Sequence, residues 1–363
     1  MTRIGPYLVL LAFTMSLPGI SKDPAGPRSD PPVRADEIVI GLLLPDHSHN
    51  DVIHAAEFAI RQANTSGTYG NLKFTLAVRY AEGFWGAGSK ESVSLVYEDH
   101  VCAIIGVLDG RNGHLAEQVA TKSHLSYIET FATEPTLSQA FVPWFKRVVP
   151  NDNQQAEIIM DQIERDGGGR ICILTQESYD TRFAERSLTK AAARGNGRSP
   201  QILSLDTTGY DREALVRQIS ECDPDCLVIP FDASFMEDLL ASLRTARPSM
   251  KIYGTLHFAM GAELRGPWQD YEGVCMIYPR LPGDPPAALA DSRSAYLSDA
   301  FRLVMHAAYR TGTQREAISD FISETPFSEG ITGSISFDEL GNRQDACSLI
   351  RIQNGKPRYL ETP

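Results

Sequence analysis

Two apolar runs in this chain each end in small or polar residues, and the two runs lie one helix apart. Residues 101–105 lead into Gly106 and the glycine-rich segment 108–113, and residues 125–128 lead into the polar segment 129–135. Glycines let a backbone approach a ligand closely, and the free N–H groups at a helix start favour anions. In open α/β sheets, ligands bind beyond the carboxyl ends of the strands. The pattern therefore predicts a small-molecule site at these two turns.

A second group of residues that could bind a ligand or a metal ion is a cluster of histidines. His47, His49 and His54 have a spacing that could bind zinc. They also stand at the start of a helical pattern, where Asn50 or Asp51 would make a good N-cap. Metal binding and a solvated loop at a helix start both remain open from the residues alone.

Composition and motifs narrow the class of function. The chain has 363 residues, 42% of them apolar, which is enough for a sizeable core and suggests two domains. A net charge of −12 argues against a nucleic-acid or anionic-membrane partner, since phosphate neutralisation needs clustered Lys and Arg. The chain lacks a Gly-x-Ser-x-Gly elbow, a His-Glu-x-x-His pair and a phosphate-binding Gly-x-x-x-x-Gly-Lys loop. We expect neither an enzyme nor a bound cofactor.

The N-terminus has the pattern of a signal peptide. Arg3 supplies the positive region, residues 7–13 the apolar region, and residues 19–21 a small-x-small cleavage site. The apolar run is too short to span a bilayer. We therefore expect residues 1–21 to be removed on export to the periplasm, and the Pro-rich residues 22–36 to form a flexible leader.

Beyond residue 37, strand and helix patterns alternate, which is typical of parallel sheets with helices on both faces. The expected strands are 38–44, 73–79, 103–105, 126–128, 170–174, 201–204, 226–229, 251–254 and 273–278. The expected helices are 54–64, 91–98, 114–122, 153–166, 182–193, 212–221, 235–245 and 294–311.

The six cysteines fall into two groups. Cys222 and Cys226 could close a short disulfide loop in an oxidising compartment, although so short a spacing does not guarantee the geometry. Cys102, Cys172 and Cys275 lie inside apolar strand runs and are expected to be buried thiols, and the sixth opens a further strand-like run.

Several segments, taken together in their order and spacing, resemble the periplasmic ligand-binding proteins of the branched-chain amino acid transporters. The segments that carry the resemblance are residues 38–45, 55–64, 104–106, 132–138, 147–152, 154–155 and 330–342. The resemblance covers nearly all of the chain after the leader.

This resemblance implies an α/β fold of two Rossmann-like lobes joined by a three-strand hinge, the type I periplasmic binding fold. The chain would cross between lobes near residues 149–152, 279–282 and 330–333. Lobe 1 would comprise residues 37–149 with 280–331, and lobe 2 residues 150–279 with 332–363. The implied function is closure of the lobes around a small, carboxylate-bearing ligand such as an amino acid, and its delivery by a monomer to the permease of an ABC transporter. A ligand-sensing module that signals to a separate membrane protein is the alternative.

The resemblance also implies which residues meet the ligand. Lobe 1 would hold the ligand carboxylate, and lobe 2 would complete the site. The matching residues are Gly110, Arg111, Phe131, Ala132 and Thr133 in lobe 1, with His47 as a further contact, and Tyr179, Phe231, Asp232, Leu256 and His257 in lobe 2.

Two departures from the family pattern concern the ligand. Gly110 and Arg111 stand where amino-acid binders present a hydroxyl, and Leu256 and His257 stand where they present an acidic residue for the ammonium group. An unpaired ammonium in a closed cleft is costly, so either Asp232 or Asp109 would have to replace that acid, or the ligand is not an ordinary branched-chain amino acid.

Overall fold

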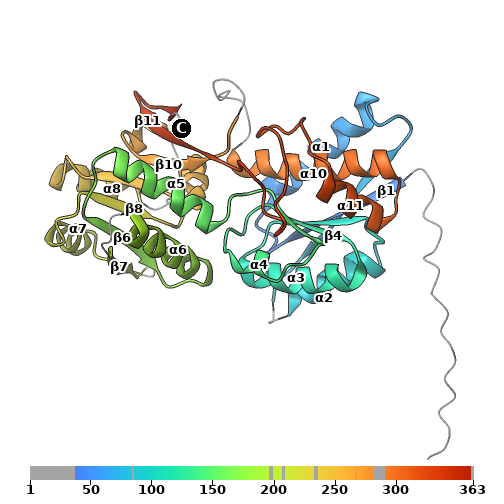
Figure 1. The fold of residues 1–363 in the computed structure, drawn as a ribbon, viewed down its shortest axis with the longest axis horizontal. Helices are drawn as coiled ribbons and strands as arrows, with labels where there is room; N and C mark the ends of the chain where they lie inside the picture. Colours follow the sequence, from blue (N-terminus) through green and yellow to red (C-terminus); the bar gives the residue numbers. More distant parts are fainter. Residues whose placement is uncertain are drawn as a thin grey trace, which may run out of the picture. The chain divides into compact units, whose positions relative to one another are not determined.

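Two separate sheets organise the chain (Figure 1). The structure is a computed structural model that describes residues 37–83, 86–195, 199–206, 209–232, 236–265, 267–281 and 291–360. The expected signal peptide and leader, residues 1–36, lie outside the described residues. The first sheet has the strand order β2-β1-β3-β4-β5, and the second has the order β12-β11-β10-β9-β8-β6-β7.

The first sheet is parallel throughout. Its strands are β1 (Glu37–Leu44), β2 (Lys73–Tyr80), β3 (Ala103–Gly106), β4 (Ser126–Glu129) and β5 (Phe145–Arg147). Its helices are α1 (Asn50–Ser66), α2 (Ala87–Tyr97), α3 (Gly110–Ser123), α4 (Thr136–Gln139), α10 (Ser292–Thr311) and α11 (Arg315–Glu324). Helices α1, α10 and α11 cover one face, and α2 and α3 cover the other (Figure 1).

The second sheet is parallel from β7 to β10 and antiparallel at its β11–β12 edge. Its strands are β6 (Ile171–Gln176), β7 (Gln201–Leu205), β8 (Cys226–Ile229), β9 (Lys251–Gly254), β10 (Cys275–Tyr278), β11 (Ser348–Gln353) and β12 (Lys356–Tyr359). Its helices are α5 (Asp152–Arg165), α6 (Tyr179–Gly195), α7 (Arg212–Glu221), α8 (Glu237–Ala246), α9 (Leu256–Arg265) and the 3₁₀ turn η1 (Trp268–Tyr271).

Alternation along β8 shows why this sheet needs helices on both faces. Cys226 and Val228 point into the apolar cluster shared with α5 and α6, whereas Leu227 and Ile229 point into the cluster shared with α7 and α8. All four side chains are fully buried. A strand that is buried on both faces has a continuous apolar sequence, as this one does. The predicted α/β fold with two sheets is confirmed.

The chain crosses from the first sheet to the second for the last time at a later position than the sequence predicted. Residues 332–343 remain bonded to the first sheet: Arg147 donates from its N–H to Gly341 O at 2.8 Å, and Arg343 donates from its N–H to Arg147 O at 3.0 Å. The buried guanidinium of Arg343 also lies 3.7 Å from the carboxylate of Asp299 in α10. The passage therefore falls between Arg343 and Ser348, where β11 begins, and not at residues 330–333.

Some local expectations were wrong. Helix α1 begins at Asn50, with His49 as the N-cap and no side-chain cap, so neither Asn50 nor Asp51 caps it. Helices α9 and α11 and the short strand β5 were not expected at all.

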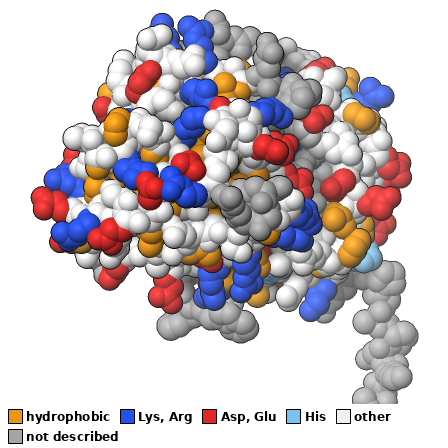
Figure 2. All heavy atoms as spheres, turned by 60° about the vertical axis from the view of Figure 1, so that its left-hand side comes forward, with side chains coloured by type: hydrophobic (Ala, Val, Ile, Leu, Met, Phe, Trp, Pro, Cys, Tyr) orange, Lys and Arg blue, Asp and Glu red, His pale blue; other side chains and the backbone are white. Residues whose placement is uncertain are grey.

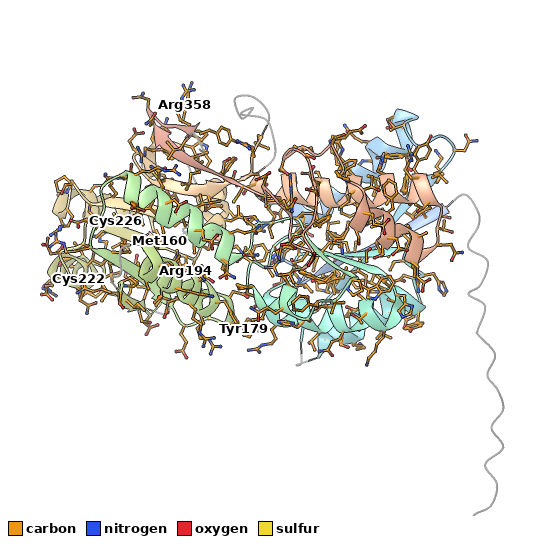
Figure 3. All side chains as sticks on the ribbon, in the orientation of Figure 1. Met160, Tyr179, Arg194, Cys222, Cys226 and Arg358 are labelled. Carbon is orange, nitrogen blue, oxygen red and sulfur yellow. The ribbon has the colours of Figure 1, made fainter. Side chains whose placement is uncertain are left out.

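The six cysteines do not form disulfides. All six cysteines are free, so Cys222 and Cys226 do not form the loop considered above; both lie at the end of the second sheet opposite Tyr179 (Figure 3). Acidic and basic side chains are interspersed over the face that Figure 2 presents. None of the helices in the described part of the chain is long and apolar enough to cross a membrane.

Candidate functional site

A pocket of about 160 Å³ opens where the carboxyl ends of strands from both sheets meet. Strand β4 leads to Phe131, β6 ends at Gln176, β8 leads to Phe231 and β9 leads to His257. This is where ligands bind in open α/β sheets, because the turns after parallel strands converge there. The lining residues are Phe131, Gln176, Ser178, Asp180, Thr181, Pro230, Phe231, Asp232, His257, Met260 and Arg293.

Phe131 and His257 bridge the two sides of this pocket. Their rings stack with centroids 4.7 Å apart, and the histidine Nε2 lies 3.0 Å from the carbonyl oxygen of Phe131. A carbonyl can only accept, so Nε2 carries the proton. Burial lowers the pKa of His257, which keeps the ring neutral. The guanidinium of Arg293 lies over Phe131, 5.2 Å from its ring centroid.

The amides expected to hold a ligand carboxylate already bind a carboxylate of the protein. Oε1 of Glu129 accepts hydrogen bonds from the N–H groups of Thr130, Phe131 and Ala132 at 3.0, 2.8 and 3.0 Å. Its other oxygen accepts from the hydroxyl of Tyr127. Glu129 is fully buried, and burial raises its pKa to about 7 despite these donors.

The amide of Gly110 is also occupied. It donates to Oδ1 of Asp180 at 3.0 Å, so the first residue of α3 is joined to the first turn of α6. Burial, together with the charges of Asp109 and Glu134, raises the pKa of Asp180 to about 6. Asp109 itself is the N-cap of α3 and accepts from the N–H of Asn112.

Thr133 has a protein partner as well. Its carbonyl oxygen accepts a hydrogen bond from the Asp152 N–H at 2.7 Å, and its side chain partly opposes the rise of the Asp152 pKa. Both residues are buried. Burial raises the pKa of Asp152 to about 7, with the nearby Asp180 and Glu134 adding to the effect. Thr133 therefore joins the turn after β4 to the start of α5.

The remaining residues expected at the site lie around the pocket and do not line it. Arg111 is exposed, and its guanidinium lies 5.6 Å from the centroid of the Tyr179 ring. Tyr179 stands at the start of α6 (Figure 3), and Ala132 is buried behind the turn. His47 stacks on Tyr80, with centroids 3.6 Å apart. Of the expected contacts, the structure brings Phe131, Phe231, Asp232 and His257 to the pocket wall.

Two charged pocket residues, Asp180 and Arg293, were missed by sequence reasoning. Asp180 was adjacent to an expected contact, but nothing in the sequence indicated that it would reach Gly110, seventy positions earlier. Arg293 follows α9 and β10 in the chain and belongs to α10, so only the folded arrangement places it beside Phe131.

The histidines are not arranged as a metal site. His49 Nδ1 lies 3.1 Å from Asp46, and His47 Nε2 lies 3.8 Å from Glu82. Over the residues that the structure describes, no group of three His, Cys, Asp or Glu side chains is positioned to hold an ion.

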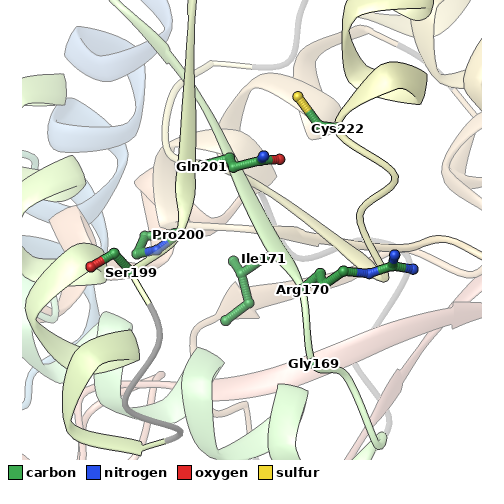
Figure 4. Close-up of a pocket in the computed structure, with 7 residues that line it drawn as sticks. All are labelled: Gly169, Arg170, Ile171, Ser199, Pro200, Gln201 and Cys222. Carbon is green, nitrogen blue, oxygen red and sulfur yellow. The ribbon is translucent and has the colours of Figure 1, made fainter.

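A different pocket, of about 190 Å³, lies at the amino ends of β6 and β7 (Figure 4). Its only lining cation in the described chain, Arg170, is paired with Asp223 and lies 3.1 Å from Asp225. The pocket between the two sheets is therefore the better candidate for ligand binding.

Comparisons with known proteins agree with this geometry. Residues 52–209 match the receptor family ligand binding region. The metabotropic glutamate receptor-like protein E of Dictyostelium discoideum is 25% identical over 243 residues, which are 61% of this chain. The chain spans only 29% of the length of that relative.

Solved structures resemble the whole described fold. An ABC transporter substrate-binding protein of Desulfitobacterium hafniense in complex with Leu has a TM-score of 0.72 at 16% identity, covering 89% of this chain and 100% of that one. The branched-chain amino acid transporter substrate-binding protein of Streptococcus pneumoniae in complex with isoleucine has a TM-score of 0.74 at 18% identity, covering 88% and 97%. A solute-binding protein of R. palustris in complex with benzoate has a TM-score of 0.74 at 14% identity, covering 89% and 95%. The chain is therefore a two-lobed protein of the type I periplasmic binding fold, and its residues 52–209 match the receptor family ligand binding region.

Proposed function

We propose that this protein is an extracytoplasmic receptor that closes its two lobes around a small, carboxylate-bearing ligand and delivers it to the permease of an ABC transporter. The observation that carries the proposal is the pocket between the sheets, whose wall combines Phe131 and Arg293 from one side with Asp232 and His257 from the other. A pocket lined from both lobes makes its full set of contacts only when the lobes are closed. Binding then stabilises the closed form, which a membrane partner can recognise.

The ligand is an amino acid or a related acid. The pocket has apolar surface from Phe131, Phe231 and Met260, and its other lining residues are mostly polar or charged. A wall that combines apolar surface with convergent polar groups is typical of a small-molecule site. The protein acts by binding alone and needs no cofactor.

A sensing role is the second candidate, and the receptor-like relative favours it. The same closure would then be read by a separate membrane protein, without transport. Uptake of radiolabelled ligand by cells with and without the gene separates the two roles. Loss of uptake supports transport, and unchanged uptake with a lost cellular response supports sensing.

Thermal unfolding of the chain from about Lys22 onward, against amino acids, short peptides, carboxylates and aromatic acids, tests binding itself. A ligand that binds only the folded protein raises Tm with concentration. Asp232→Asn tests whether that carboxylate receives an amino group, and the exposed Glu221→Gln is its control. If none of these compounds raises Tm, the proposal is wrong.

A further inference from the structure

The donors that a ligand carboxylate would use in the turn after β4 and at the start of α3 are already occupied. The amides of Phe131 and Ala132 are bonded to Glu129, and the amide of Gly110 is bonded to Asp180. A ligand anion placed at either position would face a carboxylate of the protein and would have to displace it from these three amides. An acidic ligand therefore needs another cationic or N–H partner in the pocket.

Arg293 is such a partner. It is the only Lys or Arg among the described residues that line the pocket. Among the described residues, its guanidinium forms an ion pair only with the half-exposed Asp51, whose Oδ2 lies 3.9 Å from Nη1 of Arg293. That separation is at the outer limit of an ion pair, so the guanidinium keeps donors for a further acceptor.

The position of Arg293 in its helix also suggests a role other than stability. It is the second residue of α10, a helix of 20 residues. A cation near a helix N-terminus is opposed by the helix dipole, which favours anions there. The side chain nevertheless turns inward, is only 15% exposed and packs over Phe131. A bound anion would offset both the dipole repulsion and the loss of solvent around the guanidinium.

We propose that Arg293 binds the anionic group of the ligand, in place of the backbone amides after β3 and β4. This inference rests on the proposed receptor function and names the residue that fixes the ligand's orientation. The acidic end of the ligand would face α10 and Phe131, and the rest of the ligand would extend toward Phe231 and Met260. A guanidinium binds a carboxylate through two parallel hydrogen bonds, so it selects a planar acid group by geometry as well as by charge.

The test is a thermodynamic cycle between Arg293 and the ligand's acid group. Titration calorimetry would use the L-amino acids and benzoate as acid probes, with L-leucinamide and benzamide as the partners of leucine and benzoate that lack the carboxylate. The variants are Arg293→Gln and Arg293→Lys, and Arg302→Gln on the same helix is the matched control. Urea unfolding without ligand checks that each variant is folded.

We expect Arg293→Gln to weaken binding of the acid probe roughly 30-fold or more, because it removes one partner of a desolvated charge pair. Arg293→Lys should fall between it and the wild type, and Arg302→Gln should stay within about twofold. The amide probe should bind the wild type and Arg293→Gln equally weakly, because removing the ligand carboxylate and removing the guanidinium abolish the same interaction.

The inference would be overturned if replacing the acid probe by its amide weakened binding equally in the wild type and in Arg293→Gln. The acid group would then be bound by another residue. In that case binding itself would persist and the receptor function would stand. If no probe binds the wild-type protein, both the receptor function and the inference fail.

Discussion

Oε1 of Glu129 accepts a 2.8 Å hydrogen bond from the backbone N–H of Phe131, in the turn that was predicted from the sequence to hold a ligand's acid group. The carboxylate is fully buried, and its partners are fixed by the local chain: three successive amides and the Tyr127 hydroxyl. The turn is thereby ordered without a ligand.

Stability should decrease as pH rises through the slightly acidic range. Burial raises the pKa of Glu129 to about 7 and that of Asp152 to about 7. Between the ordinary carboxyl pKa near 4 and these values, the folded protein binds more protons than the unfolded chain, so raising the pH favours unfolding. We expect the free energy of unfolding, measured by urea denaturation, to fall by on the order of 1–3 kcal/mol between pH 4.5 and 8. The Glu129→Gln/Asp152→Asn variant should have a flatter profile, and an equally steep one would contradict the assignment.

Thr133→Val should reduce stability and leave ligand affinity nearly unchanged. The substitution keeps the shape and removes the hydroxyl whose interaction favours the charged form of the buried Asp152 carboxyl. Leaving a buried carboxyl short of one partner costs about 1–2 kcal/mol. Urea midpoints measure the loss, with the exposed Thr65→Val as control. A large loss of affinity at unchanged stability would instead restore Thr133 as a ligand contact.

Gly110→Ala should separate α3 from α6. A Cβ atom there would lie 2.9 Å from Glu134 Oε1 and 3.0 Å from Asp180 Oδ1, so one of these carboxylates must move. We expect a loss of about 1–3 kcal/mol, as for other overpacked sites. Gly209→Ala is the matched control, because a Cβ atom at that glycine meets no atom within 4 Å. Equal stability of the two variants would mean that the contact between Gly110 and Asp180 is not maintained in solution.

Arg343→Met should be strongly destabilising. Its fully buried guanidinium bonds the carbonyls of Thr332 and Ser334 and lies 3.7 Å from Asp299, which is also fully buried. Removal of one partner of a buried pair leaves the other charge uncompensated and costs about 3–5 kcal/mol. Arg61→Met, which breaks an exposed pair with Glu57 within α1, should cost about 0.5 kcal/mol or less. Calorimetric or urea unfolding of both variants measures the difference.

Local sequence patterns predicted much of the fold but only part of the site. The bounds of β8, β9 and α7 agree with the expectation because short apolar runs and one clear amphipathic segment define them. Helix α9 was missed because its first residues, Leu256 and His257, were considered only as ligand contacts.

The site depended on contacts that no local pattern encodes. Phe131 and His257 were expected to meet the ligand, and the structure places both at the pocket. Asp180 and Arg293 reach their partners, Gly110 and Phe131, only through the packing of segments that are far apart in the chain. Glu129 lay within a segment singled out from the sequence, but its side chain turns back onto its own turn, and a strand pattern does not predict that geometry.

The pairing of β10 with β11 also has a consequence for how the chain acquires its structure. Cys275 pairs with Arg351, so the second sheet is completed only by strands that follow α10 and α11 in the chain. Two strands separated by so long a segment pair slowly, because the chain loses conformational entropy on closing the loop before the stabilising contacts form. During synthesis β10 is therefore an open strand edge, and a chain that stops before β11 would keep that edge as a template for aggregation.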